Sequence, residues 1–223
     1  MSETEPMPRR RRGRPPADSE PIATREEILD LALEAFADLG YHAASIRELT
    51  RRLNVSHGLF HAKFGSKMAL WKAAVDHGMR RLVQQLDVAA YSDRMHATPE
   101  ERLREVFVSL LLGLDQAPAV LRLMNYEGLQ QSDRLEYIYE RYMTIGSFQG
   151  DVIIDEGVKA GVFRDVSRPT IFFLLAHGGG AVFSLRALAS KLGLPQARSK
   201  KAARARAEEV ADTLIRGILV DRR

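Results

Sequence analysis

The sequence predicts an all-α protein, and three observations point to that fold class. Capping boxes of the form Ser/Thr-x-x-Glu occur at "TREE", "SIRE" and "TPEE", and each precedes a stretch with helical periodicity. Apolar residues recur at spacings of three and four along most of the chain, whereas the strict alternation of strands is nearly absent. With 223 residues, the chain can bury a core as one large domain or as a small domain joined to a larger one.

The composition predicts a cytoplasmic protein. The chain is 45% hydrophobic and 28% charged, and it contains no cysteine, which agrees with a reducing compartment. No signal peptide is visible, because the polar N-terminal residues lead into no apolar segment. The longest apolar run, "IFFLLAHGGGAVFSL", is short for a membrane span and has a histidine and three glycines at its centre. We therefore expect no membrane partner, no cofactor and no metal.

The positive charge is concentrated in two patches near the N-terminus. Residues 1–16 hold five arginines against two glutamates, although the net charge of the whole chain is only +4. Between Arg47 and Lys72 there are six basic residues and a single acid, Glu48. Either patch alone would be interpreted as a solvated surface. Two separated basic patches indicate a polyanionic partner, with nucleic acid as the first candidate.

Four helices are predicted in the first part of the chain, and each has its own start signal. The expected ranges are 25–39, 46–53, 57–64 and 67–86, with Thr24, Ser45, Ser56 and Ser66 as the capping residues. Gly40 is expected to end the first of these helices. Only Asn54 and Val55 separate the second helix from the cap of the third. Two short helices joined by such a tight turn form a helix-turn-helix.

A helix-turn-helix suits DNA because its second helix enters the major groove while its first helix crosses the backbone. The angle between the two helices would be fixed by the apolar residues Ile46, Leu49, Leu53, Val55, Phe60 and Phe64. The exposed positions of the third helix, His57, Gly58, Leu59 and His61, would then be free to reach base edges. On pattern alone, a helical hairpin without any DNA role is an equally good interpretation.

Residues 24–75 resemble the N-terminal domain of the tetracycline-repressor (TetR/AcrR) family of bacterial transcription regulators. The resemblance lies in "AFADLGY", in "SIRELTRRLNVSHG" and in the pattern F-x-S-K-x-x-L from Phe64 to Leu70. It implies a homodimer that binds a palindromic operator in double-stranded DNA, represses transcription, and is released by a small apolar ligand. A transcriptional activator of the same family is the alternative. A helical small-molecule-binding protein and an esterase-like enzyme are the alternatives outside it.

The resemblance also implies a division of the chain and a set of DNA-binding residues. We expect a disordered basic arm at 1–22, a helix-turn-helix domain at 23–70, and a helical domain for effector binding and dimerisation at 71–223. Leu59 and His61 depart from the family, which usually has a polar residue and a tyrosine there. A leucine can still contact a thymine methyl group, and an imidazole can still donate to phosphate. The expected DNA-binding residues are Arg12, Arg14, Ser45, Arg47, Ser56, His57, Gly58, Leu59, His61, Lys63 and Lys67.

Two of these assignments have alternatives. His57 and His61, at i and i+4, have the spacing of a metal-binding pair, but no third ligand is evident nearby. The segment Arg12-Gly13-Arg14-Pro15 matches the core of an AT-hook, a motif whose arginines enter a narrow A·T minor groove. A solvated tail that aids solubility is the rival interpretation of this arm.

The C-terminal part is predicted to contain helices at 99–114, 118–124, 133–161, 169–192 and 200–220. The candidate ligand-binding residues are aromatic or otherwise suited to an apolar pocket: Met124, Tyr126, Tyr142, Phe172 and His177. The last two helices carry apolar residues on more than one face, and in the family such helices form the dimer interface. The candidate interface residues are Gly178, Val182, Leu185, Leu214 and Ile218. The segment "HGGG" resembles an esterase oxyanion hole, but no Gly-x-Ser-x-Gly accompanies it, so no enzyme is predicted.

Overall fold

The computed structural model describes residues 24–90, 97–143 and 149–221. Its regular secondary structure is helical, apart from an isolated bridge between Phe163 and Leu219, so the predicted fold class is confirmed. The N-terminal helices are α1 (Arg25–Ala43), α2 (Ile46–Arg52), α3 (His57–Phe64) and α4 (Lys67–Ala90). They are followed by α5 (Pro99–Gln116), α6 (Pro118–Glu127), α7 (Asp133–Tyr142), α8 (Gln149–Lys159), α9 (Arg168–Phe172), η1 (Phe173–Gly179), α10 (Ala181–Ser184), α11 (Arg186–Lys191) and α12 (Lys200–Ile218).

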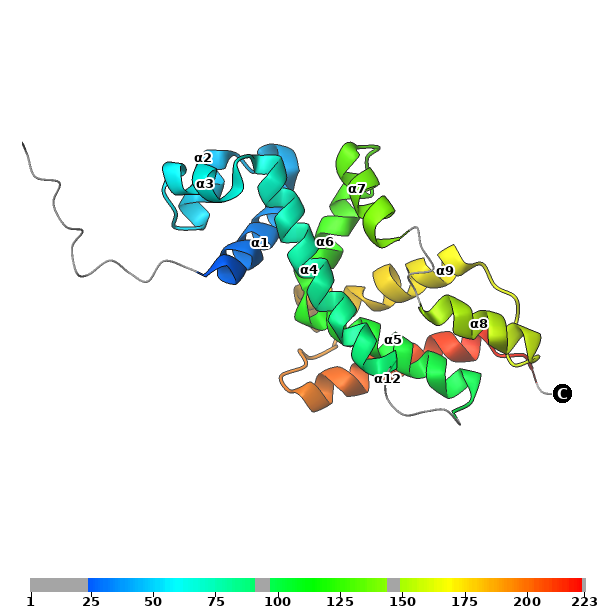
Figure 1. Ribbon diagram of the computed structural model, residues 1–223. Helices are drawn as coiled ribbons and strands as arrows, with labels where there is room; N and C mark the ends of the chain where they lie inside the picture. The colour runs from blue at the N-terminus through cyan, green and yellow to red at the C-terminus, as the bar shows by residue number, and fades with distance from the viewer. Residues whose placement is uncertain (1–23, 91–96, 144–148, 222–223) are drawn as a thin grey trace, which may run out of the picture.

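The helix α4 connects the two parts of the molecule. It starts beside α2 and α3 at one end and runs into the bundle formed by the C-terminal helices (Figure 1). Near its start, α4 packs against α1, and farther along it packs against α5, which in turn lies beside α8 and α12. The helix α4 runs without a break across residue 70, so no change of secondary structure marks the expected domain boundary, which stays a prediction. Trp71, the one tryptophan of the chain, is fully buried in α4 between the rings of Tyr41 and Tyr137.

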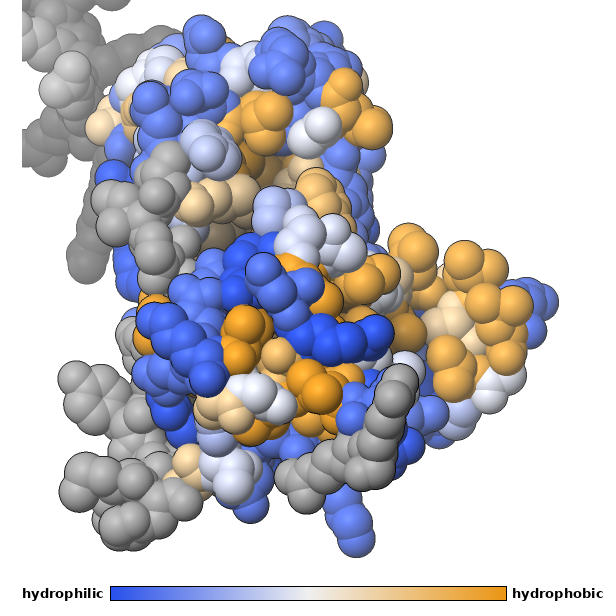
Figure 2. Space-filling model, turned by 90° about the vertical axis from the view of Figure 1, so that its right-hand side faces the viewer, coloured by the Kyte–Doolittle hydropathy of each residue, from blue (hydrophilic) through white to orange (hydrophobic). Residues whose placement is uncertain are grey.

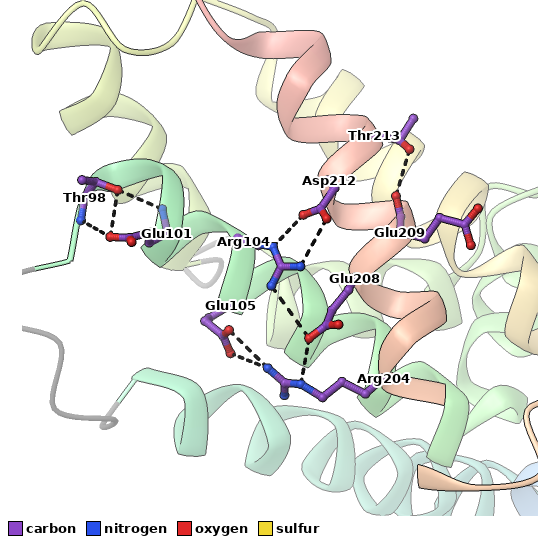
Figure 3. A network of polar contacts seen from close by, with 9 residues as sticks. All are labelled: Thr98, Glu101, Arg104, Glu105, Arg204, Glu208, Glu209, Asp212 and Thr213. Carbon is purple, nitrogen blue, oxygen red and sulfur yellow. Dashed lines mark hydrogen bonds and ion pairs between the residues drawn. The ribbon is translucent and has the colours of Figure 1, made fainter. Parts of the chain in front are cut away.

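The predicted capping signals give two complete boxes and one incomplete box. Thr24 and Glu27 exchange hydrogen bonds at the start of α1, and Thr98 and Glu101 do the same at the start of α5 (Figure 3). At α2, the hydroxyl of Ser45 accepts from the backbone N–H of Glu48 at 3.1 Å. The carboxylate of Glu48 is turned to arginine side chains instead of back to Ser45. The second capping box is therefore only half formed, because charged donors are stronger partners than a neutral amide.

Gly40 interrupts α1, as its sequence position suggests. Its φ of 71° and ψ of 162° break the regular helix, which continues to Ala43 beyond the break. A Cβ atom at this position would lie 2.2 Å from Cζ of Tyr126, which belongs to α6. Glycine therefore serves two purposes here, since it permits the left-handed φ and the close approach of α6.

Two of the helices predicted in the C-terminal part are each divided into shorter helices, so the prediction that they are continuous is wrong. The expected helix at 133–161 is divided into α7 and α8, and residues 144–148 between them lie outside the described part of the chain. The expected helix at 169–192 is divided into α9, the π-helix η1, α10 and α11. Three consecutive glycines favour this irregularity because glycine is a poor helix former. A Cβ atom on Gly179 would also lie 2.6 Å from Cγ1 of Val210, so Gly179 allows α12 to pack closely.

The helices α5 and α12 are joined by a network of ion pairs on top of their apolar contact (Figure 3). Arg104 of α5 lies 2.6 Å from Asp212 and 3.8 Å from Glu208, both in α12. Arg204 of α12 pairs with Glu208 at 2.9 Å and with Glu105 of α5 at 3.2 Å. These side chains are partly exposed, so each pair contributes little on its own. We call these five residues the α5–α12 network.

A different set of contacts joins α1 to α6, and α6 to α7. Arg122 of α6 pairs with Glu34 and, at 3.5 Å, with Asp38, both in α1. Glu127 of α6 and Arg134 of α7 form an ion pair whose side chains are only 2% and 8% exposed. Together with the contact of Tyr126 on Gly40, these pairs form what we call the domain junction.

Among the described helices, none is long and apolar enough to cross a membrane alone, although α5 and α6, bent by 91°, pass that test as a pair.

Candidate nucleic-acid interface

The turn between α2 and α3 has the compact geometry of a helix-turn-helix. Asn54 adopts a left-handed conformation with φ 49°, and the N–H of Val55 donates to the carbonyl oxygen of Thr50 at 3.1 Å. The hydroxyl of Ser56 then caps α3 by accepting from the N–H of Leu59 at 3.1 Å. These local hydrogen bonds set the direction in which α3 leaves the turn.

The two sides of α3 differ in character. Phe60 and Phe64 are buried, with ring centroids 6.0 Å apart, and they attach the helix to the core. The opposite side exposes several of the residues predicted to contact DNA: His57, Gly58, His61 and Lys63. Leu59 is half-buried at the edge between the two sides. A helix that is fixed by two aromatic anchors and polar on its outer side is suited to enter a groove.

Glycine at position 58 has no steric explanation within the protein. A Cβ atom built there meets no atom within 4 Å, and its φ lies outside the left-handed region. In a helix, glycine is less stable than alanine, so the residue carries a cost that the described structure does not offset. The open space in front of Gly58 would let another molecule approach the backbone of α3.

The cations of α2 fall into two groups. Arg51 and Arg52 both donate to the carboxylate of Glu48, at 2.7 Å and 2.8 Å. These hydrogen bonds, that of Arg51 first, lower the pKa of Glu48 to about 2. Arg47 is exposed and lines an open hollow with the other side chains of the turn: Thr50, Arg51, Asn54, Val55 and Ser56. Two arginines, Arg47 and Arg51, thus border the hollow, and arginine is a suitable partner for phosphate. Thr50, Arg51 and Asn54 were not predicted as site residues, because the sequence alone does not show that the folded turn brings them to one hollow.

His61 has a defined role within α3. Its Nδ1 atom lies 3.0 Å from the carbonyl oxygen of Gly65, which accepts a hydrogen bond from it. In the neutral ring, the Nε2 atom is then an acceptor, whereas the sequence interpretation had the ring donating to phosphate. An acceptor in the major groove suits the exocyclic amine of adenine or cytosine. The rings of His57 and His61 are 4.6 Å apart, and within the described ranges no group of three possible metal ligands includes them.

Lys67 lies at the start of α4, where the hydroxyl of Ser66 accepts from the N–H of Ala69 at 3.1 Å. The ammonium group is 4.4 Å from the centre of the Tyr41 ring and donates to the carbonyl oxygen of His42 at 3.4 Å. Partial burial, and then the nearby charge of Arg134, lower the pKa of Lys67. Neither Tyr41 nor Arg134 was predicted as a site residue, because Arg134 is distant in sequence and its contact with the ring has no local signal.

The predicted ligand-binding residues do not meet at one place. Tyr126 lies against Gly40, and the hydroxyl of Tyr142 donates to Asp76 at 2.5 Å. Met124 borders a small apolar cavity between α1, α4, α6 and α7. Phe172 and His177 do contact each other, with ring centroids 5.5 Å apart. His177 is also bonded to Asn125, and burial lowers its pKa.

The predicted interface residues lie at or near the surface, with one exception. Gly178 and Leu185 are exposed, while Val182 and Leu214 are half-buried and line an open, mostly apolar groove between η1 and α12. Ile218 is only 4% exposed and packs into the core, so it offers little surface to a second copy of the chain. Hydrophobic side chains also gather on the part of the surface that projects at the right of Figure 2. Leu188, which the sequence interpretation also counted among the apolar residues of these helices, is exposed, and so are Phe173, Leu174 and Leu192, which it did not name.

Comparisons with known proteins agree with this geometry. The family described as "Bacterial regulatory proteins, tetR family" matches residues 28–74. The HTH-type transcriptional repressor Rv3405c of Mycobacterium tuberculosis is 33% identical over 129 residues, which cover 56% of this chain and 69% of that protein. The HTH-type transcriptional regulator BetI of Escherichia coli is 35% identical over 86 residues, covering 37% of this chain and 42% of the relative.

Solved structures show the same fold at low sequence identity. The ketosteroid transcriptional regulator KstR2 of Mycobacterium tuberculosis superimposes with a TM-score of 0.62 and 19% identity, covering 89% of this chain and 96% of the other. The TetR family transcriptional regulator PfmR of Thermus thermophilus has a TM-score of 0.58 and 24% identity, covering 90% and 99%. These structural similarities also cover the C-terminal helices, which lie beyond residue 74, where the family match ends.

Proposed function

We propose that this chain, which belongs to the tetR family of bacterial regulatory proteins, represses transcription as a homodimer bound to a palindromic DNA operator. Like the relatives that it matches, it is a helix-turn-helix transcriptional regulator; it is not an enzyme. The backbone N–H of Gly180, in the esterase-like segment, donates to the carbonyl oxygen of Leu175 at 2.9 Å. That amide is used within the helix, so it could not hold a developing oxyanion.

The observation that carries the proposal is the two-sided character of α3. Phe60 and Phe64 anchor the helix, while His57, Gly58 and His61 face outward where base edges would lie. Arg47 and Lys63 are exposed beside this face, as phosphate contacts require. An operator that overlaps a promoter would be blocked by such a complex with no further contact. The relative named as a repressor supports this direction of control.

Dimerisation would place two copies of α3 in successive major grooves on one side of the duplex. The exposed apolar residues of 173–192 and the groove bordered by Val182 and Leu214 support an interface at the C-terminal end. We infer that a small apolar ligand releases the operator. Phe172 and His177 are the best supported of the predicted ligand contacts, because they already form one cluster with Asn125.

The basic arm would add a second DNA contact. Arg12 and Arg14 lie outside the described residues, so their role rests on the Arg-Gly-Arg-Pro pattern and on charge. Each phosphate that a cation neutralises releases counterions, which raises affinity even where no base is read. Removal of residues 9–14 is expected to weaken DNA binding and to reduce its dependence on salt.

A nuclease footprint over the DNA flanking the protein's own gene tests the proposal. We expect protection of a palindrome by the full chain, and loss of protection when an apolar effector is added. Arg47→Ala/Lys63→Ala is expected to abolish protection without changing the melting temperature. Absence of any protected palindrome, with folded protein at micromolar concentration, would exclude operator binding at that locus. Enhanced transcription from a protected promoter would indicate an activator instead.

A further inference from the structure

The surroundings of the Tyr41 ring contain two cationic side chains, Lys67 and Arg134, but only one carboxylate, that of Glu127, is paired with them. The ring of Tyr41 has two cations over it, the Lys67 ammonium at 4.4 Å and the Arg134 guanidinium at 4.5 Å. Arg134 is neutralised by Glu127, whose two carboxylate oxygens accept from Nε at 3.0 Å and 2.9 Å. Among the residues that the structure describes, no carboxylate pairs with Lys67. The site thus carries one uncompensated positive charge.

The three side chains come from separate parts of the fold. Tyr41 lies near the end of α1, Lys67 begins α4, and Arg134 lies in α7 of the C-terminal part. Arg134 cannot easily move, because it and Glu127 are buried and bonded to each other. The Tyr41 ring is fixed in addition by Phe36, at a centroid distance of 6.0 Å, and by the edge contact with Trp71 at 6.5 Å.

We propose that Arg134 is a positioning residue for DNA binding, which holds the Tyr41 ring so that the ammonium of Lys67 faces a DNA phosphate. This inference rests on the proposed function, since the anion that completes the site is the operator backbone. The ring attracts both cations, while the two cations repel each other across a short distance. Arg134 is locked in place by Glu127, so Lys67 is the group that is directed outward.

The hydrogen-bonding capacity of Lys67 agrees with this role. An ammonium group has three donors, and the described structure uses one of them, in the bond to the carbonyl of His42. Two donors remain for phosphate oxygens. The lowered pKa of Lys67 has the same origin, since burial and the charge of Arg134 both disfavour its cationic form until an anion arrives.

The test compares salt-dependent binding of a fluorescent duplex that carries the palindrome protected in the footprint. The variant Glu127→Gln/Arg134→Gln replaces the ion pair by two amides, so no buried charge is left alone. We expect its affinity to fall by about tenfold, and the slope of log affinity against log salt to become shallower by about one. Lys67→Gln alone is expected to give the same two changes.

Combining the variants decides whether Arg134 acts through Lys67. Adding Lys67→Gln to Glu127→Gln/Arg134→Gln should cause no further loss, whereas a purely structural role for Arg134 would make the losses additive. Arg141→Gln is a matched control, because Arg141 also lies over a tyrosine ring, 5.9 Å from the centre of Tyr137, but belongs to neither basic patch. Its salt slope should equal that of the wild type.

A second pair of variants keeps the test decisive if the amide pair does not fold. Tyr41→Leu retains apolar volume but removes the ring, and it should reproduce the loss seen with Lys67→Gln. Tyr41→Phe retains the ring and should bind as the wild type does. Wild-type slope and affinity in Tyr41→Leu or in the amide pair would overturn the inference while leaving operator binding intact. A wild-type protein that shows no salt-dependent binding would instead refute the proposed function.

Discussion

The Glu127–Arg134 pair of the domain junction and the α5–α12 network both join helices through ion pairs, yet they differ in exposure. At the junction, Glu127 and Arg134 are almost completely buried. In the α5–α12 network, Arg104 and Asp212 are 32% and 37% exposed, and water can replace either partner (Figure 3). A buried charge that loses its partner has no substitute, whereas a surface charge regains its hydration. The contact between α6 and α7 should therefore be less tolerant of substitution than the exposed ion pairs, which include the pairs of Arg122 with Glu34 and Asp38 that join α6 to α1.

The largest expected effect is at the buried pair. Glu127→Ala leaves the guanidinium of Arg134 buried without a carboxylate, and it should lower the free energy of unfolding by about 3–5 kcal/mol. Urea denaturation followed by circular dichroism measures this loss. The control Glu127→Gln/Arg134→Gln removes both charges and should be much closer to the wild type. A loss below about 1 kcal/mol in Glu127→Ala would show that the pair is solvated in solution.

Gly40 gives the second effect, and Gly65 is its matched control. Both residues have φ 71°, but a Cβ atom on Gly40 would collide with Tyr126, while one on Gly65 meets nothing within 4 Å. Gly65→Ala should cost about 1–2 kcal/mol, which is the left-handed conformation alone. Gly40→Ala should cost clearly more, because Tyr126 must also move. If thermal unfolding gave the same loss of stability for both variants, Tyr126 would be able to move away from Gly40 at no cost in free energy.

A smaller effect is expected in the α5–α12 network. Arg104→Ala should lower the free energy of unfolding by at most about 1 kcal/mol, and high salt should reduce the difference. The hydrogen bond from Arg104 lowers the pKa of Asp212 below its ordinary value. Its contribution is therefore present above the pKa of the unfolded chain, about 3.9, and is lost as the pH falls further. Wild type and Arg104→Ala should converge in acid; a difference that persists there would argue against this pair.

The smallest effect on stability is expected outside both regions, at Gly58. Gly58→Ala should leave stability unchanged or raise it by about 0.5 kcal/mol, since alanine is the better helix former and the site is open. DNA affinity should nevertheless fall, because the new methyl group occupies the face of α3 that approaches the groove. Anisotropy with the operator duplex and a thermal melt measure the two quantities. Unchanged affinity would remove Gly58 from the interface.

The N-terminal helices were predictable because their signals are local. Caps at Thr24, Ser45 and Ser56 lie three residues or fewer from the groups they bond, so the sequence shows them directly. The exception, Glu48, failed as a capping partner because Arg51 and Arg52 compete for its carboxylate one turn later. The family resemblance predicts that the DNA-binding face lies on α3.

The C-terminal part was less predictable because its determinants are distant in sequence. The π-helix η1 ends at consecutive glycines, where Gly179 packs closely against Val210 of α12, and helical periodicity does not reveal this contact. The predicted ligand residues share a chemical type but not a location, since Tyr126 faces α1 and Tyr142 bonds to Asp76 of α4. Arg134 would be classed as a surface residue of α7 from its sequence, and only the fold brings it to Tyr41.

The position of Trp71 makes the protein its own spectroscopic reporter. Because the chain has a single tryptophan, all indole emission comes from one place, between Tyr41 and Tyr137. Its Nε1 atom is buried and, within the described structure, has no hydrogen-bond partner, so the emission should be blue-shifted. Any rearrangement that admits water between α4 and its neighbours would shift that emission to the red. Candidate effectors can therefore be screened by intrinsic fluorescence, with no label and before the operator sequence is known.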